Sequence, residues 1–277
     1  GARVRHLPVN RKMTVSLWVA VQSYPVVKVD DPNPGGQTCI VNCLDDNARS
    51  GFGYFIGFDG QYSFQVYVGS EKVIVNVPAP LPRNRWNCLT AVVDTDARIL
   101  RFYNNGDQVA QADCPSGTIS VGEAPLHVAQ DGWEVWFGSG VDAFRTTAFG
   151  GLLDELTIYD EALPEATLRS WRADAPPTLA IPESRYADDK WHPRFHGCPS
   201  GAWTNETHGL VRADGRYHLF FQKNAAGPYM ARLHWGHLSS DNLYDWHEEK
   251  IALVPGEPYA DGERFHYDMK GCWSGIG

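Results

Sequence analysis

The stretch that decides the fold is "HPRFHGCPSGAWTNETHGLVRADGRYHLFFQ", residues 192–222. It holds two short runs, "THGLVRAD" and "RYHLFFQ", that meet at Asp214-Gly215. An Asp-Gly pair accepts the positive φ angles of a tight turn, so the stretch predicts a β-hairpin. Just before this hairpin stands Glu206, between Asn205 and Thr207. Its position raises the question whether Glu206 is a nucleophile or only a loop residue.

Two further strand patterns follow the hairpin, "RLHWGHLSS" and "WHEEKIALVP", joined by a turn through "DNLYD". Four strands joined by hairpins form a meander sheet of the size of one propeller blade. A single blade leaves its edges unpaired and one face uncovered. The last residues, "GCWSGIG", therefore predict the entrance to a second blade.

From Met13 to about Ile158 the chain shows short alternating strands separated by Gly, Asn and Asp turns. This spacing predicts an antiparallel sandwich or jelly roll, and the Asn-Gly pair in "YNNGDQVA" predicts another tight hairpin. Residues 172–190 change abruptly to Pro, Ala and charge, which predicts a linker. The strands expected before it are "MTVSLWVAVQ", "GYFIGFD", "YSFQVYVG", "KVIVNVP", "WNCLTAVVD" and "ILRFYNN".

The composition narrows the possible partners. The chain has 277 residues, 43% of them hydrophobic, which is enough for two globular domains. A net charge of −9 argues against nucleic acid, and no apolar run is long enough to span a membrane. The N-terminus lacks the basic and apolar regions of a signal peptide, while a start at Gly1-Ala2 leaves a removed export signal open. The expected location is extracellular or periplasmic.

Neither the cysteines nor the histidines form a recognised metal motif. The six cysteines lack C-x-x-C spacing, which leaves two disulfides, one or none open. Cys39 and Cys43, in a predicted loop, are the best candidates for a bridge. His234 and His237 are three residues apart on a predicted strand and so point to opposite faces. We expect no metal site and no cofactor.

The first part of the chain resembles the laminin-G-like, concanavalin A-like lectin domains. The resemblance covers residues 1–171 and implies a jelly-roll sandwich. Its last motif places Asp154 and Glu155 before a strand and a short helix after Pro164. The matching segments are "TVSLWV" (14–19), "PLPRNRWNCLTAVVDTDARILRFYNNGDQVA" (80–110) and "GGLLDELTIYDEALPEATLRSW" (150–171).

No diagnostic sugar site stands out in this first part. Trp133 and Trp136 could stack on a sugar, but burial in the sandwich is the commoner fate of such residues. Asp30 and Asp31 could hold calcium, but a solvated loop is the simpler interpretation.

Residues 191–277 resemble the start of the catalytic domain of glycoside hydrolase family 32, the β-fructofuranosidases. "HPRFHGCPSGAWTNETHGL" stands where the family has H-F-x-P-x-x-G-W-M-N-D-P-N-G-L. "DGRYHLFFQKN", "LHWGHLSSDNLYDWHEEKIALVP" and "GCWSG" follow in the family order. The resemblance implies the first blade of a five-bladed β-propeller.

The resemblance also implies a retaining mechanism on a fructofuranosyl residue. Glu206 occupies the position of the nucleophile. Asn205 and Gln222 would hydrogen-bond fructose hydroxyls, Trp235 and Trp273 would line the pocket, and Ser274 would add a hydroxyl contact. Among the carboxylates near "GCWSG", Asp268 is the candidate for a further lining residue.

This chain departs from the family pattern in two ways. Glu206 replaces the Asp of the family, and Thr207-His208 replaces Pro-Asn, which favours a remodelled site over a single disabling change. The acid/base and an Arg-Asp pair come from later blades in the family, so the chain is expected to be incomplete. Glu248 and Glu249 are predicted to be solvated charges at the edge of the blade.

The leading hypothesis is a glycosidase acting on a fructan or a sucrose-like substrate, with the remaining propeller fragment as a possible partner. The alternatives are a non-catalytic carbohydrate-binding relative, a glycosidase for a different furanoside, and a purely structural sandwich fragment. The fold alone cannot rank these, because propellers support many chemistries.

Overall fold

The computed structural model describes residues 2–3, 10–25, 37–57, 59–129, 149–179, 183–193, 195–225, 230, 233–255, 268 and 271–276. The chain forms two compact units, Gly1–Pro177 and Thr178–Gly277. The division falls inside residues 172–190. Four of the residues singled out above, Trp133, Trp136, Asp30 and Asp31, lie outside the described residues.

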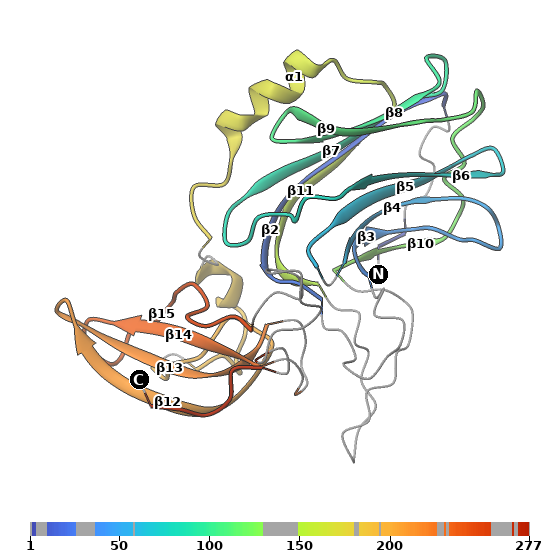
Figure 1. The fold of residues 1–277 in the computed structure, drawn as a ribbon. Helices are drawn as coiled ribbons and strands as arrows, with labels where there is room; N and C mark the ends of the chain where they lie inside the picture. Colours follow the sequence, from blue (N-terminus) through green and yellow to red (C-terminus); the bar gives the residue numbers. More distant parts are fainter. Residues whose placement is uncertain are drawn as a thin grey trace. The chain divides into compact units, whose positions relative to one another are not determined.

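The first unit is a sandwich of two antiparallel sheets (Figure 1), so the all-β sandwich expected from the sequence is confirmed. The six-stranded sheet has the order β1-β10-β3-β4-β5-β6 and the five-stranded sheet the order β11-β2-β7-β8-β9. The bounds of the first sheet are β1 Ala2–Arg3, β3 Gln37–Asn42, β4 Phe52–Gly57, β5 Tyr62–Val68, β6 Glu71–Val77 and β10 Pro125–Val128. Those of the second are β2 Lys12–Ser23, β7 Asn87–Asp94, β8 Ile99–Asn104, β9 Asp107–Asp113 and β11 Gly150–Tyr159.

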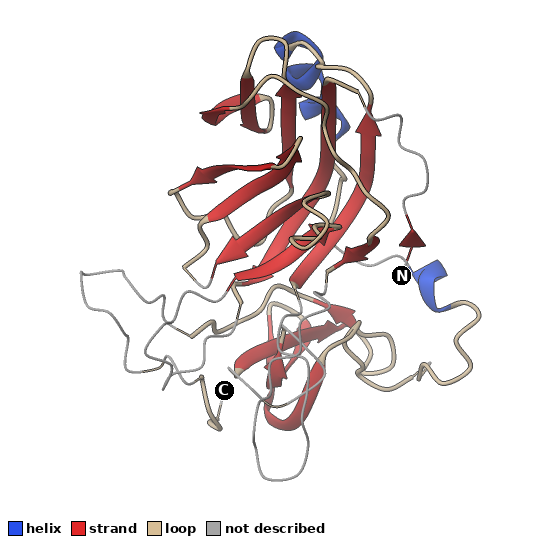
Figure 2. Ribbon diagram, turned by 90° about the vertical axis from the view of Figure 1, so that its right-hand side faces the viewer, coloured by secondary structure: helices blue, strands red, loops and turns tan. Residues whose placement is uncertain are grey.

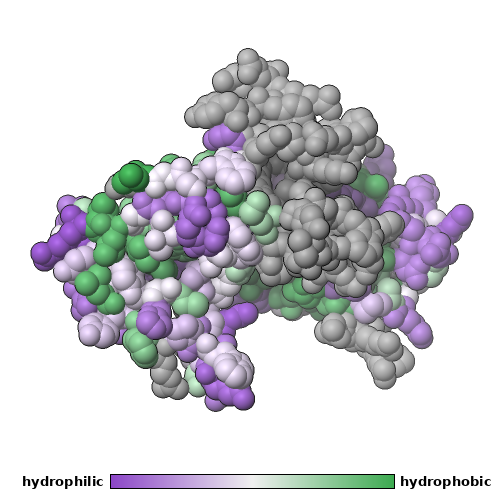
Figure 3. All heavy atoms as spheres, turned by 90° about the horizontal axis from the view of Figure 1, so that it is seen from below, coloured by the Kyte–Doolittle hydropathy of each residue, from purple (hydrophilic) through white to green (hydrophobic). Residues whose placement is uncertain are grey.

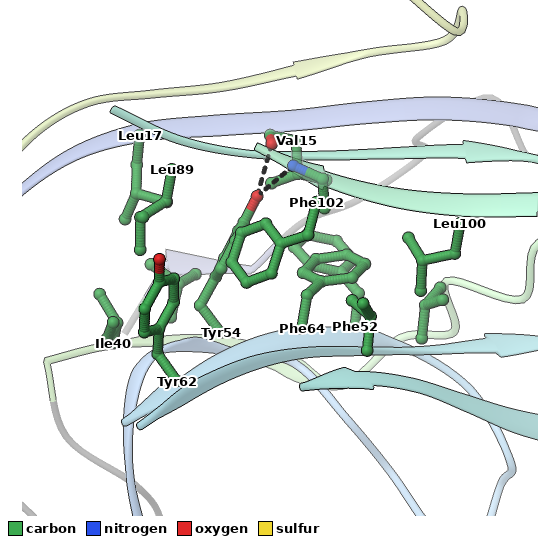
Figure 4. Packing of buried hydrophobic residues seen from close by; sticks show 14 of the residues in the cluster. Val15, Leu17, Ile40, Phe52, Tyr54, Tyr62, Phe64, Leu89, Leu100 and Phe102 are labelled. Atoms are coloured by element: carbon green, nitrogen blue, oxygen red, sulfur yellow. Dashed lines mark hydrogen bonds between the residues drawn. The ribbon is translucent and has the colours of Figure 1, made fainter. Parts of the chain in front are cut away.

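The core of the sandwich lies between the two sheets and is rich in aromatic rings (Figure 4). Tyr54 of β4 is fully buried, and its hydroxyl crosses to the other sheet. It donates to the carbonyl of Val15 at 2.5 Å and accepts from the backbone N–H of Ala91 at 2.9 Å. Burial raises the pKa of Tyr54 well above its ordinary value. The phenol thus satisfies its polar group while it links the two sheets.

The hairpin predicted from Asn-Gly is confirmed between β8 and β9. Asn105 and Gly106 have φ angles of 52° and 76°, and Asn104 pairs with Asp107 across the turn. Two successive residues with positive φ form the tight turn that suits the twist of the flanking strands.

The closing segment of the first unit differs in one detail from the expectation. Asp154 and Glu155 lie inside β11, at a register shift where Glu155 has a φ of 48°, and not ahead of the strand. The predicted helix is confirmed as α1, Glu165–Ser170, which begins after Pro164. A 3₁₀ helix, Trp171–Asp174, follows it.

The bridge considered between Cys39 and Cys43 is not formed. All six cysteines are thiols, and the Cys43 thiol donates to the carbonyl of Phe52. Cys39 lies in strand β3, not in a loop. An extended chain advances about 3.3 Å per residue, so positions four apart are separated by more than a disulfide can bridge. Desolvation raises the pKa of Cys43 to about 11.

The second unit is built on one antiparallel sheet in the order β12-β13-β14-β15 (Figure 2), as the hairpin pattern predicted. The Asp214-Gly215 turn has φ angles of 49° and 83°. The fourth strand is shorter than expected, and beyond it Trp235 forms an isolated bridge to Leu253. The bounds are η2 Glu183–Tyr186, β12 Trp203–Ala213, β13 Arg216–Asn224, β14 His234–Ser240 and β15 His247–Glu248.

Hydrophobic and hydrophilic residues are interspersed on the described surface seen in Figure 3. Among the exposed large apolar side chains of the second unit are Trp273, 55% exposed, and Ile276. None of the helices in the described part of the chain is long and apolar enough to cross a membrane.

Candidate active site

A bulge in β12 places the central carboxylate. The register of β12 against β13 shifts between Thr204 and Thr207, so that Asn205 and Glu206 both stand opposite Gln222. The extra residue of a bulge bends the strand and changes the direction of its side chains, and bulges are frequent beside active sites. Glu206 therefore lies in a strand rather than in the loop considered from the sequence.

Gln222 is the centre of a hydrogen-bond network. Its side chain is buried, and its Nε2 donates to Oε1 of Glu206 at 3.2 Å and to Oγ of Ser274 at 3.3 Å. Its Oε1 accepts from Nδ2 of Asn205 at 3.3 Å. A buried amide with both ends satisfied is held in one orientation. Gln222 thus orients the groups around it.

The carboxylate of Glu206 is held through one oxygen. Oε1 accepts from the amide of Gln222 and from the hydroxyl of Ser274. Among the described residues no donor reaches Oε2, and the side chain is exposed. The arrangement fixes the orientation of the carboxylate and leaves Oε2 without a donor in the described part of the chain.

The C-terminal segment reaches this site by running beside β14. Leu233 and Gly271 form a parallel bridge, and the backbone N–H of Cys272 donates to the carbonyl of Leu233 at 2.8 Å. Gly271 has a φ of 129°, and a Cβ there would lie 2.6 Å from the nitrogen of Leu233. The close approach requires glycine. It carries the segment forward to Ser274.

Two tryptophans adjoin this network. Trp235 pairs with Gln222 across β14 and β13, so its side chain is on the same face as the amide. Its Nε1 donates to the carbonyl of Trp273 at 2.8 Å. The indole of Trp273 is exposed, so an aromatic ring is available to a ligand.

The structure therefore brings six of the seven residues singled out from the sequence into one network. The seventh, Asp268, is half-buried, and its carbonyl accepts from the N–H of Gly271 at 2.8 Å. Asp268 thus shapes the turn that precedes the site. A role for its carboxylate in lining the site remains a prediction.

The prediction that Glu248 is a solvated charge was wrong. Lys223, whose side chain is 3% exposed, forms an ion pair with Glu248. Ser200 adds two hydrogen bonds to the same carboxylate, from its N–H at 2.8 Å and from its hydroxyl at 2.5 Å. Burial alone would raise the pKa of Glu248, but the attraction of Lys223 and these hydrogen bonds outweigh it and lower the pKa.

Glu249 also has polar partners, although its side chain is more exposed than that of Glu248. Its carboxylate accepts from the hydroxyl of Ser239 at 2.6 Å and lies 3.5 Å from the guanidinium of Arg216.

The ion pair between Lys223 and Glu248 lies on the other face of the sheet from the site. Because Lys223 is next to Gln222 on β13, the side chains of these two residues point to opposite faces. The Lys223–Glu248 pair thus belongs to the face away from Glu206.

The histidines of β14 behave as their spacing predicted. His234 is fully buried, whereas His237 faces Phe220 and lies 3.0 Å from His218 through ring nitrogens. Burial lowers the pKa of His237, and the neighbouring His218 and Arg216 lower it further, against the opposing charge of Glu249. No group of three or more His, Cys, Asp or Glu side chains suited to a metal ion occurs among the described residues.

His208 is the site neighbour that the sequence did not single out as functional. It lies at a second register shift of β12, is 5% exposed, and packs its ring on Trp235. The only sequence signal for His208 was that it stands where the family signature has Asn.

Each unit matches a known protein family. Residues 2–169 match the concanavalin A-like lectin/glucanases superfamily, and residues 196–276 match the glycosyl hydrolases family 32 N-terminal domain. The raffinose invertase of Escherichia coli is 41% identical over 85 residues, which are 31% of this chain and 16% of that protein. The levanase of Bacillus subtilis is 37% identical over 75 residues, 27% of this chain and 11% of that protein. The chain thus spans only a small part of the length of these relatives.

Among solved structures, a pentraxin from Limulus polyphemus aligns with a TM-score of 0.43 and 16% identity, over 61% of this chain and 73% of that one. This similarity is too low to support an argument. The two family matches, in contrast, lie on the two units that the structure separates. The second unit matches the N-terminal domain of glycosyl hydrolases family 32. The match of the first unit covers more than half of the whole chain, and the chain therefore belongs to the concanavalin A-like lectin/glucanases superfamily.

Proposed function

We propose that this protein is a glycoside hydrolase of the β-fructofuranosidase type, which cleaves fructose-containing oligo- or polysaccharides with retention of configuration. The family 32 match supports the hydrolase class, and relatives that match the same residues include a raffinose invertase and a levanase. The lectin-like unit would suit an enzyme whose substrate is a polymeric fructan. The proposal includes an extracellular or periplasmic location.

The observation that carries the proposal is the state of Glu206. Gln222 and Ser274 hold its Oε1, while Oε2 accepts no hydrogen bond from any described residue. A retaining glycosidase needs a carboxylate oxygen that is oriented and free to attack the anomeric carbon. We assign this attack to Oε2 of Glu206, with Oε1 kept in place by its two donors.

The rest of the reaction follows from the chemistry of retention. Attack at the anomeric carbon breaks the glycosidic bond, and a general acid protonates the departing oxygen. Water then cleaves the fructosyl ester of Glu206 and regenerates the carboxylate. We assign no residue of this chain to the general acid. The amides of Asn205 and Gln222 and the exposed ring of Trp273 are the groups proposed to bind the sugar.

The bulge in β12 supports the proposal that glutamate serves here where the family has aspartate. Glutamate places its carboxylate one methylene further from the backbone, and misplacement of a reacting group by about 1 Å costs roughly 100-fold in rate. The double-residue bulge opposite Gln222 sets the backbone of Glu206 so that its carboxylate meets Gln222 and Ser274. Glu206→Asp is therefore expected to lose these hydrogen bonds and to lower activity rather than restore it.

The experiment measures fructose release from sucrose, inulin and levan by the intact protein. Glu206→Gln keeps the shape of the side chain and removes the nucleophile, so activity should fall by on the order of 10³-fold or more. Glu123→Gln, at an exposed acidic residue of the first unit, is the matched control and should match the wild type. Wild-type rates in Glu206→Gln would disprove the assignment of the nucleophile.

A second candidate is a non-catalytic carbohydrate-binding protein. The observation that favours it is Glu206 in place of the aspartate of the family, because the longer side chain displaces the carboxylate by one methylene. Calorimetric titration with the same sugars separates the two functions. Saturable binding without fructose release in the wild type would identify a binding protein, whereas release that depends on Glu206 would identify the hydrolase.

A further inference from the structure

His208 has an unusual environment for an ionisable side chain. It is the only residue of β12 that is buried, and it lies where the register shifts between Thr207 and Gly209. Its Nε2 is shielded from solvent and has no hydrogen-bond partner in the described part of the chain. A buried polar atom without a partner costs free energy and calls for a physical explanation.

The main contact of His208 is with an aromatic ring of the site. The imidazole lies on the indole of Trp235, with the ring centroids 4.5 Å apart and the planes inclined by 31°. Phe220 approaches the same indole more distantly, with 6.3 Å between the centroids. His208 therefore supports Trp235 at closer range than the other neighbouring ring.

The position of the indole matters for the carboxylate. Nε1 of Trp235 donates to the carbonyl of Trp273 at 2.8 Å, and the next residue, Ser274, donates its hydroxyl to Glu206. A rotation of the indole would break the first bond and remove the contact nearest to Ser274 among those that hold this segment, beyond the bond between Cys272 and Leu233. The orientation of Trp235 is thus coupled to one of the two donors that hold Glu206.

The ring of His208 acts in its neutral form. Burial lowers the pKa of His208, and the negative charge of Glu206 opposes this effect without reversing it. A neutral imidazole is a flat and weakly polar aromatic ring, which can stack on an indole. Protonation would add a second N–H donor and a charge to a buried position.

We propose that His208 is a positioning residue of the Glu206 site: its neutral ring fixes the indole of Trp235, and through Trp273 it holds Ser274 against the carboxylate. The effect on hydrolysis rests on the function proposed above, whereas the effect on the indole does not. This difference allows the two ideas to be tested separately.

The test uses two substitutions in the intact chain and follows the Trp235 Nε1–H signal by NMR, assigned with Trp235→Phe. His208→Phe keeps a flat ring and removes the titration, whereas His208→Ala removes the ring. Hydrogen exchange at Nε1 should accelerate by roughly tenfold in the alanine variant, the scale of one lost hydrogen bond, and stay near the wild-type rate in the phenylalanine variant. His247→Ala, at an exposed histidine of β15, is the control.

Hydrolysis supplies the second measurement. His208→Ala should lower kcat by roughly tenfold with a smaller change in KM, because a loosened Ser274 misaligns Glu206 and leaves the other sugar contacts in place. His208→Phe should restore most of kcat. Rescue by a ring that neither charges nor hydrogen-bonds would assign the effect to packing on Trp235.

The outcomes separate the inference from the proposed function. Slow exchange at Nε1 in His208→Ala, equal to that of the wild type, would overturn the inference even if the enzyme is active. Faster exchange in a protein that releases no fructose would support the positioning role and reject the hydrolase. If the alanine variant does not fold, a pH titration of the wild type supplies the test. The chemical shift of the Trp235 Nε1–H should then change as His208 is protonated, and a shift that stays constant would overturn the proposal.

Discussion

Gln222 donates its buried side-chain amide to Oε1 of the exposed Glu206 across 3.2 Å. The bond joins two strands at a point where two residues of β12 face one residue of β13. Because a buried amide has few alternative partners, it holds the carboxylate more firmly than a mobile surface donor would.

The first prediction concerns this amide. Gln222→Met keeps the approximate length of the side chain but removes its donor to Glu206. The proposed hydrolysis should then slow by roughly 100-fold, the cost of losing one preorganised donor at an active site. Fructose release at saturating substrate measures the effect, and Gln111→Met, at an exposed glutamine of β9, is the control. An unchanged kcat would show that Gln222 does not orient the carboxylate.

A second prediction concerns the buried ion pair on the opposite face of the same sheet. Lys223→Met leaves Glu248 without its cation in a partly buried position and should cost about 3–5 kcal/mol of unfolding free energy in the second unit. The double variant Lys223→Met/Glu248→Leu should be less destabilised than the sum of its two single variants, since neither partner is then left alone.

Urea unfolding monitored by hydrogen exchange of β13 amides measures the stability of this unit, and Lys250→Met, at an exposed lysine, is the control. The pKa of Glu248 is lowered in the folded chain. Its contribution is therefore complete above the ordinary pKa of glutamate, about 4.3, and is lost as the pH falls through the lower folded value. Additive effects of the two substitutions would refute the coupling.

The parts of the structure that the sequence predicted depend on local chemistry. Asn105-Gly106 and Asp214-Gly215 specify tight turns by themselves, and the alternation around them specifies strands. The bulge at Glu206 was not predicted, because register depends on the strand opposite and not on the residues that bulge. The paired state of Glu248 was missed for the same reason, since Lys223 is 25 residues away.

A third prediction separates backbone strain from close contact in the sandwich. Gly106 has a positive φ of 76°, and an added Cβ would lie 2.6 Å from Cα of Arg169 in α1. Gly69 also has a positive φ, 59°, but nothing lies within 4 Å of its Cβ position. Gly69→Ala should therefore cost only the strain of positive φ, about 1–2 kcal/mol.

Gly106→Ala should cost about 1–3 kcal/mol more than Gly69→Ala, because the backbone of α1 must move away. Hydrogen exchange of β8 amides in the intact chain gives both values. Equal destabilisation by the two substitutions would mean that α1 is not held against the turn.

The last prediction concerns the pH dependence of the second unit. Burial lowers the pKa of His237, with help from His218 and Arg216 and against the charge of Glu249. A histidine whose pKa is lower in the folded state stabilises the fold fully above its ordinary pKa of about 6.5, and this stability is lost as the pH falls through the folded value. Unfolding free energies measured at steps from pH 8 to pH 5 should therefore decrease below about pH 6.5. His237→Gln removes the titration and should reduce the slope, whereas His247→Gln, at an exposed position, should leave it unchanged. A slope that is the same in the wild type and in His237→Gln would assign the pH dependence to other groups and contradict a destabilised imidazolium at His237.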